Sequence, residues 1–226
     1  MNIPNILHKR KYEFLLAALL IHLFIAVLLY DLDFYTNIIW PLNMLILGIF
    51  SLGIFSEKSR IQLIFKNILL ALIIFLPISI IYLKPTPLMM ELINIAHIAF
   101  YCYIFIEVLR YLLKPSYINS DIVSASACGY LLLIEIGIFS MQAIYYGTTN
   151  PFKGIDTTSF TTIYLDIVYF CSITVTSIGF GDIVPSNHYA KLATSILGIA
   201  GQFYSVVLVG IMISKYTSET GNSSKK

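Results

Sequence analysis

Residues 174–182 read Thr174-Val175-Thr176-Ser177-Ile178-Gly179-Phe180-Gly181-Asp182. In this stretch Gly179 and Gly181 stand two residues apart, and an acid follows the second glycine. Glycine reaches left-handed backbone dihedrals that other residues adopt only with strain. Glycines at alternate positions therefore allow successive backbone carbonyl groups to face the same way. The stretch lies between a short apolar segment and a long one, which predicts an irregular loop inside a membrane protein.

The string resembles the selectivity filter of the potassium-channel superfamily, in which backbone carbonyls replace the hydration shell of K⁺. The Ser177 hydroxyl would supply the innermost oxygens, and Ile178 and Phe180 would pack backwards against the supporting helix. K⁺ is then the permeant ion at the filter, and no cofactor is expected. A glycine-rich membrane loop without an ion site is the alternative. The resemblance implies an outer cation-attracting ring at Asp182 and an ion-binding filter made of Ser177, Ile178, Gly179, Phe180 and Gly181.

The composition is that of an integral membrane protein. Of the 226 residues, 58% are hydrophobic and 12% are charged, which is about half the charged share of a soluble domain. The net charge of +2 does not suggest a nucleic acid partner. Cys102, Cys128 and Cys171 are scattered in or beside apolar runs and predict neither a disulfide framework nor a metal site. The sequence contains no nucleophile–base pair and no phosphate loop, so it does not predict an enzyme.

A helix needs about 20 mostly apolar residues to cross a bilayer. Residues 160–176 are too short to span once the filter is attached, so they predict a re-entrant pore helix buried in protein or lining a cavity. The expected fold class is an all-α membrane protein with six transmembrane helices, a re-entrant pore helix and a filter loop. The six spans are predicted at Tyr12–Tyr30, Thr36–Phe55, Ile61–Leu83, Leu88–Leu113, Gly129–Tyr146 and Tyr189–Tyr216.

These spans divide the chain into parts. Residues 1–113 are expected to form a four-helix transmembrane domain at the position of a sensor, and residues 114–128 an interfacial linker. Residues 129–216 form the expected pore domain, and residues 217–226 a short polar tail. Ser120 and Asp121 are good N-cap residues for a linker helix.

The lysines and arginines predict the orientation. With the N-terminus inside, eleven of the 14 lie on the cytoplasmic side, and Lys84, Lys153 and Lys191 lie on the outer side. The positive-inside rule therefore favours cytoplasmic N- and C-termini in a multi-pass protein of the cell membrane. The same orientation places Asp182 on the outer side, as a potassium filter requires.

The fourth predicted span occupies the position of a voltage sensor in six-helix channels. A sensor needs several arginines or lysines on one face, whereas Leu88–Leu113 contains one arginine, Arg110. Voltage sensing by this route is not expected, and Glu107 is expected to pair with Arg110 one turn away. His22 and His97 are candidates for proton sensing, with hydrogen-bonded packing histidines as the alternative.

Glu135 lies inside the fifth predicted span. An intramembrane carboxylate is costly and is a functional candidate by default. A structural glutamate that is protonated, or hydrogen-bonded to a neighbouring helix, is the alternative, and the sequence leaves both open.

The pore helix carries three residues expected to brace the filter, Asp166, Tyr169 and Phe170. An acid followed by two aromatics resembles potassium-channel pore helices, where the aromatics are often Trp. Phe170 lacks a hydrogen-bond donor, but Phe180 lacks the hydroxyl that such a donor would meet, so no buried group loses its partner. We expect a filter held by packing and by one hydrogen bond from the Tyr169 hydroxyl to Asp182.

The last predicted span carries the expected gating residues. Gly201 lies twenty residues after Gly181, where potassium channels often carry a hinge glycine. A small residue for close helix packing is the alternative. Val209 and Ile213 are expected to form an apolar ring that gates by dewetting. Helical spacing places the cavity-lining face at Gln202, Ser205, Val209 and Ile213.

The run Ile199-Ala200-Gly201-Gln202-Phe203-Tyr204 resembles small six-transmembrane bacterial-type ion channels with one pore loop and no arginine-rich sensor. The resemblance implies a homotetramer with its pore on the symmetry axis. The predicted function is passive, K⁺-selective conduction across a cell membrane, without obvious voltage gating. A weakly selective cation channel and a non-conducting regulatory membrane protein are the alternatives. A potassium transporter subunit is disfavoured, because such chains carry four filter-like repeats and this chain has one.

Overall fold

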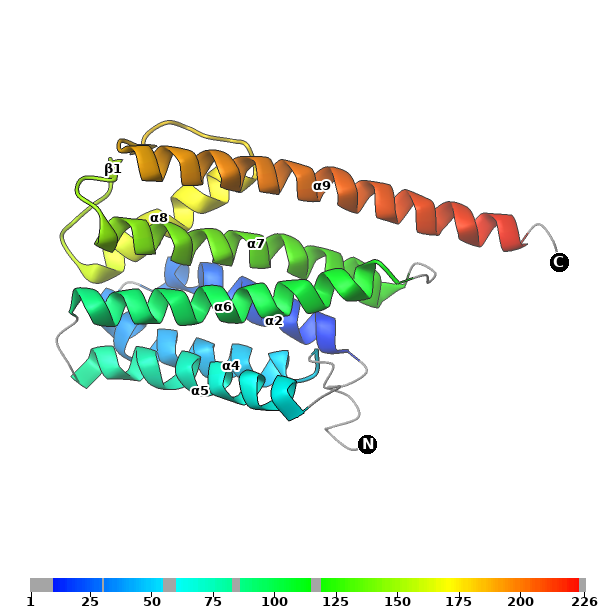
Figure 1. The fold of residues 1–226 in the computed structure, drawn as a ribbon, viewed down its shortest axis with the longest axis horizontal. Coiled ribbons are helices and arrows are strands. Elements are labelled where there is room, and N and C mark those ends of the chain that lie inside the picture. The colour runs from blue at the N-terminus through cyan, green and yellow to red at the C-terminus, as the bar shows by residue number, and fades with distance from the viewer. Residues whose placement is uncertain (1–9, 30, 55–59, 83–85, 115–118, 224–226) are drawn as a thin grey trace.

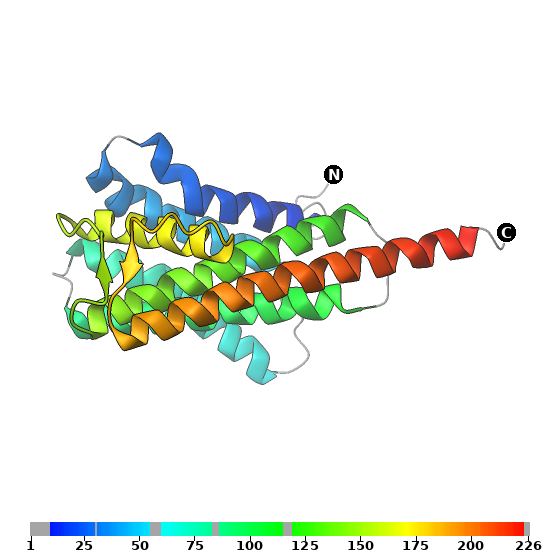
Figure 2. The same ribbon diagram turned by 90° about the horizontal axis from the view of Figure 1, so that it is seen from above.

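The computed structural model describes residues 10–29, 31–54, 60–82, 86–114 and 119–223, and this part of the chain is almost entirely helical (Figures 1 and 2). The N-terminal elements are α2 (Lys11–Phe24), the 3₁₀ helix η1 (Ile25–Leu28), α3 (Leu32–Phe34), the π-helix η2 (Tyr35–Ile39), α4 (Trp40–Ser51), α5 (Arg60–Tyr82) and α6 (Pro87–Leu112). The C-terminal elements are α7 (Ser120–Gly147), β1 (Phe152–Lys153), α8 (Phe160–Val175), β2 (Val184–Pro185) and α9 (His188–Ser223).

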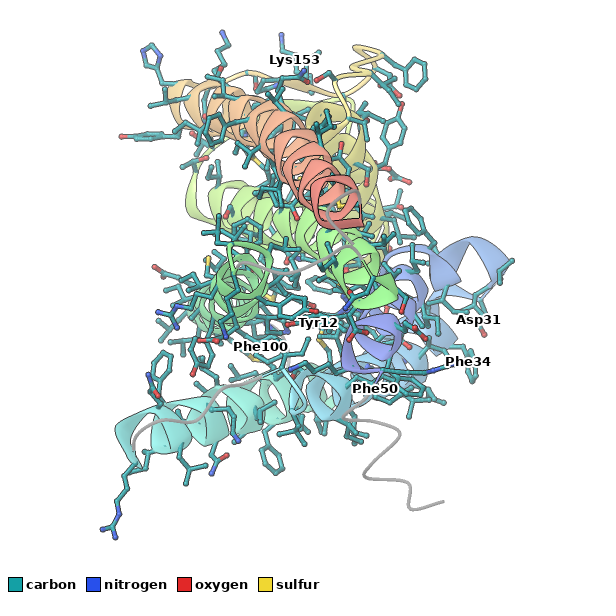
Figure 3. All side chains as sticks on the ribbon, turned by 90° about the vertical axis from the view of Figure 1, so that its right-hand side faces the viewer. Tyr12, Asp31, Phe34, Phe50, Phe100 and Lys153 are labelled. Carbon is teal, nitrogen blue, oxygen red and sulfur yellow. The ribbon has the colours of Figure 1, made fainter. Side chains whose placement is uncertain are left out.

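Helix α7 lies at the centre of the arrangement, because it contacts α2, α6, α8 and α9. The end-on view in Figure 3 shows α8 and α9 on one side of α7, and α2, α4, α5 and α6 on the other. The buried side chains of Tyr12 and Phe100 lie between these helices, whereas Lys153 lies at the outer edge. Helix α7 therefore lies between α8 and α9 on one side and a group made of α2, α4, α5 and α6, here called the four-helix unit, on the other.

Side-chain caps set where three of the helices begin. The Thr86 hydroxyl accepts a hydrogen bond from the Met89 amide at the start of α6, where Pro87 takes the first position. The Asn119 side chain accepts from the Ile122 amide at the start of α7. Ser159 and Thr162 form a reciprocal capping box at the start of α8. The prediction that Ser120 or Asp121 caps this helix is therefore wrong by one residue. The capping residue is Asn119, whose side-chain oxygen accepts from the Ile122 amide.

Two predicted boundaries differ from the structure. The predicted linker helix was expected to run into the fifth span, and helix α7 does run without a break from Ser120 to Gly147, so the structure has no boundary at Gly129. Residues 115–118 of that linker lie outside the described residues. Helix α9 continues past Tyr216 to Ser223 and extends beyond the bundle in Figure 1, so residues 217–223 of the predicted tail are helical. No proline interrupts either run, and so the helical hydrogen bonds continue.

Three helices of the described residues are long and apolar enough to cross a membrane: Leu88–Leu112, Ser120–Gly147 and His188–Ile213. The described chain also has shorter apolar helices at Tyr35–Ser51, Gln62–Leu76 and Phe160–Val175. The structure is thus mostly helical with long apolar helices, as expected of an all-α membrane protein. That the chain crosses the membrane six times stays a prediction.

Helix α8 is short, and the chain doubles back after it. In Figure 1, α8 begins at the end of the molecule where β1 lies, runs partway along α7, and is followed by a loop that returns to the same end before α9 begins. β1 pairs antiparallel with β2, with Phe152 opposite Pro185. The segment between the two strands therefore enters and leaves on one side, as the predicted re-entrant helix requires.

Glycine allows α9 to approach the end of α8 closely. A Cβ atom added at Gly201 would lie 2.7 Å from the backbone oxygen of Val175 and 3.0 Å from its Cα. A Cβ atom added at Gly210, two and a half turns further along α9, would meet no described atom within 4 Å. Close packing therefore accounts for Gly201, and a hinge there stays a prediction.

Gly201→Ala and Gly210→Ala should affect stability in opposite directions. In an exposed helix, Gly→Ala is favourable by about 1 kcal/mol, so Gly210→Ala should be neutral or stabilising. At Gly201 the new methyl meets backbone that cannot rotate away, and overpacking of this kind costs roughly 1–3 kcal/mol. Thermal unfolding of the detergent-solubilised protein, followed by circular dichroism, measures both. Equal stabilisation by the two substitutions would contradict the packing assigned to Gly201.

Candidate functional site

The backbone of the filter loop alternates in conformation. Positive φ angles occur at Ser177 (60°), Gly179 (52°) and Gly181 (81°). The glycines were expected to take this conformation, but Ser177 extends the alternation by one further position. An L-residue held in the left-handed region costs roughly 1–2 kcal/mol. The sequence gives no sign that Ser177 adopts this strained conformation. The surrounding hydrogen bonds must hold it there.

Those hydrogen bonds join the loop to the C-terminal end of α8. The amides of Ile178 and Gly179 both donate to the Ile173 carbonyl, at 2.9 and 3.2 Å. The Ser177 amide donates to the Thr174 carbonyl at 3.1 Å. Three consecutive N–H groups of the loop are therefore directed at the pore helix.

The direction of the carbonyls follows from the direction of these amides. Each peptide bond of the described chain is trans, so the C=O of a peptide unit points opposite to its N–H. The carbonyls of Thr176, Ser177 and Ile178 therefore point away from α8. A row of backbone oxygens on one side of a loop is the arrangement that coordinates a dehydrated cation when several such loops surround an axis.

The apolar side chains of the filter do not pack as expected. Ile178 is 55% exposed and Phe180 is 72% exposed. The predicted backward packing against the chain's own supporting helix is therefore wrong for a single chain. A hollow of about 330 Å³ lies beside the loop and is lined by residues that include Phe170 and Thr194. In a single chain these apolar side chains and the hollow beside them are left uncovered.

One hydrogen bond fixes the outer end of the filter. The Tyr169 hydroxyl donates to Asp182 Oδ2 at 2.7 Å, which is the bond expected from the sequence. Because this donor stabilises the charged form, it holds the pKa of the Asp182 carboxyl below its ordinary value. Asp182 is exposed and therefore presents a carboxylate to solvent.

Asp166 and Phe170 contact the outer loop rather than the filter. The Asp166 carboxylate accepts a hydrogen bond from the Asp156 amide at 2.7 Å. The ring of Phe170 packs edge-on against Phe152 of β1, with ring centroids 5.3 Å apart. These two predicted bracing residues thus hold the loop that precedes the pore helix, and Tyr169 is the one of the three with a bond to the filter end.

The outer loop at residues 147–159 packs against the residues that follow the filter, and this contact was not predicted from the sequence. Gly154 has φ +92°, and a Cβ atom there would lie 2.2 Å from the backbone oxygen of Asp182. The Ser186 amide donates to the Pro151 carbonyl at 2.8 Å. A glycine three positions after a proline in a polar loop signals an irregular turn, but no local pattern indicates a contact with a residue 28 positions away.

The inner helix meets the filter at its inner end. The Ser177 hydroxyl donates to Gln202 Oε1 at 3.4 Å, which joins two residues predicted separately for the ion path. The Ser205 hydroxyl donates to the Gly201 carbonyl at 3.0 Å, so its hydrogen bond stays within α9. Val209 is 53% exposed and Ile213 is 62% exposed. The predicted cavity face is thus uncovered in one chain, and its role stays a prediction.

Other predicted residues lie away from the filter. Arg110 donates to Glu107 at 2.5 Å, so the expected pair is present. His97 is buried, and its Nδ1 lies 2.7 Å from the Ile93 carbonyl. His22 and Glu135 were considered separately from the sequence, yet the structure places them 3.8 Å apart.

Tyr169→Phe should raise the pKa of Asp182. The phenylalanine keeps the ring but removes the donor, so the carboxyl should return toward its ordinary value and accept a proton at higher pH as the solution is acidified. NMR titration of the protein labelled at the aspartate carboxyl carbons measures this shift. Tyr189→Phe is the control, because Tyr189 is 70% exposed and lies outside the filter. An unchanged Asp182 titration in Tyr169→Phe would contradict the bond.

Comparison with known proteins agrees with this geometry. Residues 128–218 match a family model described as "Ion channel". Two pore potassium channel b of Oryza sativa subsp. japonica is 37% identical over 82 residues, which cover 35% of this chain and 22% of that protein. Two-pore potassium channel 5 of Arabidopsis thaliana is 26% identical over 100 residues, which cover 44% of this chain and 22% of that protein. No solved structure matches.

The matched region spans about a fifth of the length of these relatives. The match to the family model, at residues 128–218, contains α8, the loop at residues 176–182 and most of α9. The comparisons indicate a channel rather than an enzyme, and the bacterial-type resemblance stays a prediction. Over this region the chain is thus similar to ion channels, and the curated proteins that it matches are potassium channels.

Proposed function

We propose that the protein conducts K⁺ passively and selectively across a cell membrane. The observation that carries this proposal is the direction of the filter backbone. Amides of residues 177–179 bond to α8, and positive φ angles alternate at Ser177, Gly179 and Gly181. The coordinating oxygens belong to Ser177, Ile178, Gly179, Phe180 and Gly181, and Asp182 attracts cations at the outer mouth. The matched relatives are named potassium channels, which supports the same ion for this chain.

The functional unit that we propose is a homotetramer. One chain supplies one row of carbonyls, and a cage around K⁺ needs several rows around an axis. Exposure supports this assembly, since Phe180 is 72% exposed and Phe203 of α9 is 69% exposed. A closed symmetric ring would cover both residues with neighbouring chains or lipid and would complete the hollow beside the filter.

A weakly selective cation channel is the second candidate function. It is favoured by the bracing of the filter, in which Tyr169 bonds to Asp182 while Asp166 and Phe170 contact the outer loop. Phe180 has no hydroxyl through which a neighbour could hold it. Selectivity for K⁺ in this protein would then depend on packing by neighbouring chains rather than on further hydrogen bonds.

The four-helix unit does not supply a voltage sensor in this proposal. Arg110 is the one arginine of Leu88–Leu113, and its guanidinium is paired with Glu107. Moving one compensated charge transfers little gating charge across the membrane. A stimulus other than voltage therefore acts on the pore.

The orientation that we propose places both termini in the cytoplasm. In Figures 1 and 2 the first turn of α2 lies toward the same end of the molecule as the C-terminal part of α9. β1 and the loop carrying Asp182 lie toward the other end. With the filter mouth outside, the excess of lysine and arginine falls inside, in agreement with the positive-inside rule.

Uptake of Rb⁺ into liposomes containing the purified protein tests conduction. Wild type should load Rb⁺ against trapped K⁺, whereas Gly179→Ala should reduce the rate roughly tenfold, because a side chain at φ +52° adds backbone strain of roughly 1–2 kcal/mol beside the strain already held at Ser177. Gly198→Ala is the matched control, since its nearest neighbour is a methyl group at an ordinary 3.8 Å. No uptake by the wild type would favour a non-conducting regulatory protein, and equal uptake by Gly179→Ala would exclude this loop as the ion path.

A further inference from the structure

Three side chains from distant parts of the chain meet where the four-helix unit touches the pore helix. They are His22 of α2, Glu135 of α7 and Tyr164 of α8, with exposed fractions of 0%, 0% and 2%. His22 Nε2 lies 3.8 Å from Glu135 Oε2 and 3.3 Å from the Tyr164 hydroxyl. Trp40 of α4 packs beside Tyr164, with ring centroids 6.0 Å apart. We refer to His22, Glu135 and Tyr164 as the seam triad.

The hydrogen bonds of the seam triad are incomplete. Neither carboxyl oxygen of Glu135 has a hydrogen-bond partner among the described residues, and His22 Nδ1 has none either. At 3.8 Å the contact between His22 and Glu135 is too long for a hydrogen bond. Glu135 is therefore a fully buried carboxyl group whose closest basic neighbour does not hold it directly.

Burial indicates where the protons are. The Tyr164 hydroxyl can donate to His22 Nε2 or accept from it, so this contact fits either tautomer of the imidazole. A charged His22 would be fully buried with no hydrogen bond to a carboxylate, which favours the neutral imidazole. A neutral His22 leaves Glu135 without a counter-charge, and a buried carboxylate without partner or counter-charge is strongly unfavourable. The arrangement is consistent when Glu135 carries a proton.

We propose that the seam triad is a buried proton-binding site, in which Glu135 holds one proton and thereby keeps α2, α7 and the pore helix packed together. The ligand is the proton itself. No bond other than the carboxyl O–H forms, and the proton comes from water. The site stands whether or not the pore selects K⁺, so it goes beyond the proposed function.

The groups that face the seam triad come from every element packed around it. His97 and Tyr101 approach from α6, Tyr35 from η2, and Cys171 from α8. Each of them is neutral near pH 7 in its ordinary form. A charge appearing on Glu135 would therefore face neutral, buried groups, and the packing against α8 would weaken.

The seam triad and the filter share one short helix. Tyr164 and Tyr169 stand five residues apart on α8, one facing His22 and the other bonded to Asp182. Displacement of α8 at Tyr164 would move the same helix whose Ile173 carbonyl accepts the filter amides. The proton on Glu135 thus acts on the part of the molecule that holds the filter loop in place.

Infrared difference spectroscopy tests the proton directly. At neutral pH the wild type should show the C=O stretching band of a protonated carboxyl, which shifts in D₂O and disappears in Glu135→Gln. Glu91→Gln is the control, because Glu91 is an exposed acid on α6 and should leave the band unchanged. Labelling the glutamates with ¹³C and observing the band in wild type gives the answer even where Glu135→Gln does not fold.

A second measurement uses the pH dependence of stability. The folded protein keeps a proton that an unfolded glutamate releases above about pH 4.3, so folding becomes less favourable as pH rises. The thermal midpoint of the wild type should therefore fall relative to that of Glu135→Gln as pH is raised. The proposal fails if wild type shows no protonated-glutamate band at neutral pH and NMR shows His22 as an imidazolium, because the two groups then form an ion pair. A pH-independent difference between the two midpoints would overturn it as well.

Discussion

The Ile173 carbonyl accepts two backbone amides, those of Ile178 and Gly179, at the point where the pore helix ends. These bonds turn the N–H groups of the loop toward the helix, and trans peptide geometry then turns the carbonyls outward. Every other feature of the pore depends on this direction. The oxygens coordinate a cation only if they face the axis, and they face it only while the amides are held behind them. The positive φ angles at positions 177, 179 and 181 are the backbone conformations that this geometry requires.

The pore helix is too short to be stable in this position alone, so its neighbours hold it. Its first turn is capped by Ser159, and one face of the helix contacts the outer loop through Asp166 and Phe170. On the other face, Thr161 and Thr36 share a hydrogen bond, and Tyr164 bonds to His22. The four-helix unit therefore contacts the pore helix directly. A displacement of that unit would therefore act on α8 directly, without passing through α9.

Sequence reasoning predicted the features that depend on local pattern. The helical segments, the short helix before the filter loop and the alternating glycines follow from hydropathy and the dihedral freedom of glycine. The Tyr169–Asp182 bond was also predicted, because the loop that separates these residues is itself the recognisable stretch. The cap at Asn119 and the helical continuation to Ser223 were missed by a small margin, since neighbouring residues have similar capping and helix-forming ability.

Features that depend on distant partners were not predictable. His22 and Tyr164 are separated by 142 positions. Each is an ordinary residue of an apolar segment, so no pattern in the sequence indicates that the two side chains meet. The approach of Gly154 to Asp182 is hidden in the same way. The exposure of Ile178 and Phe180 has a different cause, because the proposed packing partners of these side chains belong to other chains of the assembly.

The central claim is that this backbone direction makes a K⁺-selective pore. The most direct measurement is the reversal potential of the purified protein in a planar bilayer, with K⁺ on one side and Na⁺ on the other. The account predicts a current that reverses close to the K⁺ equilibrium potential. A clear current that reverses near zero would contradict it, because the row of carbonyls would then fail to distinguish the two ions.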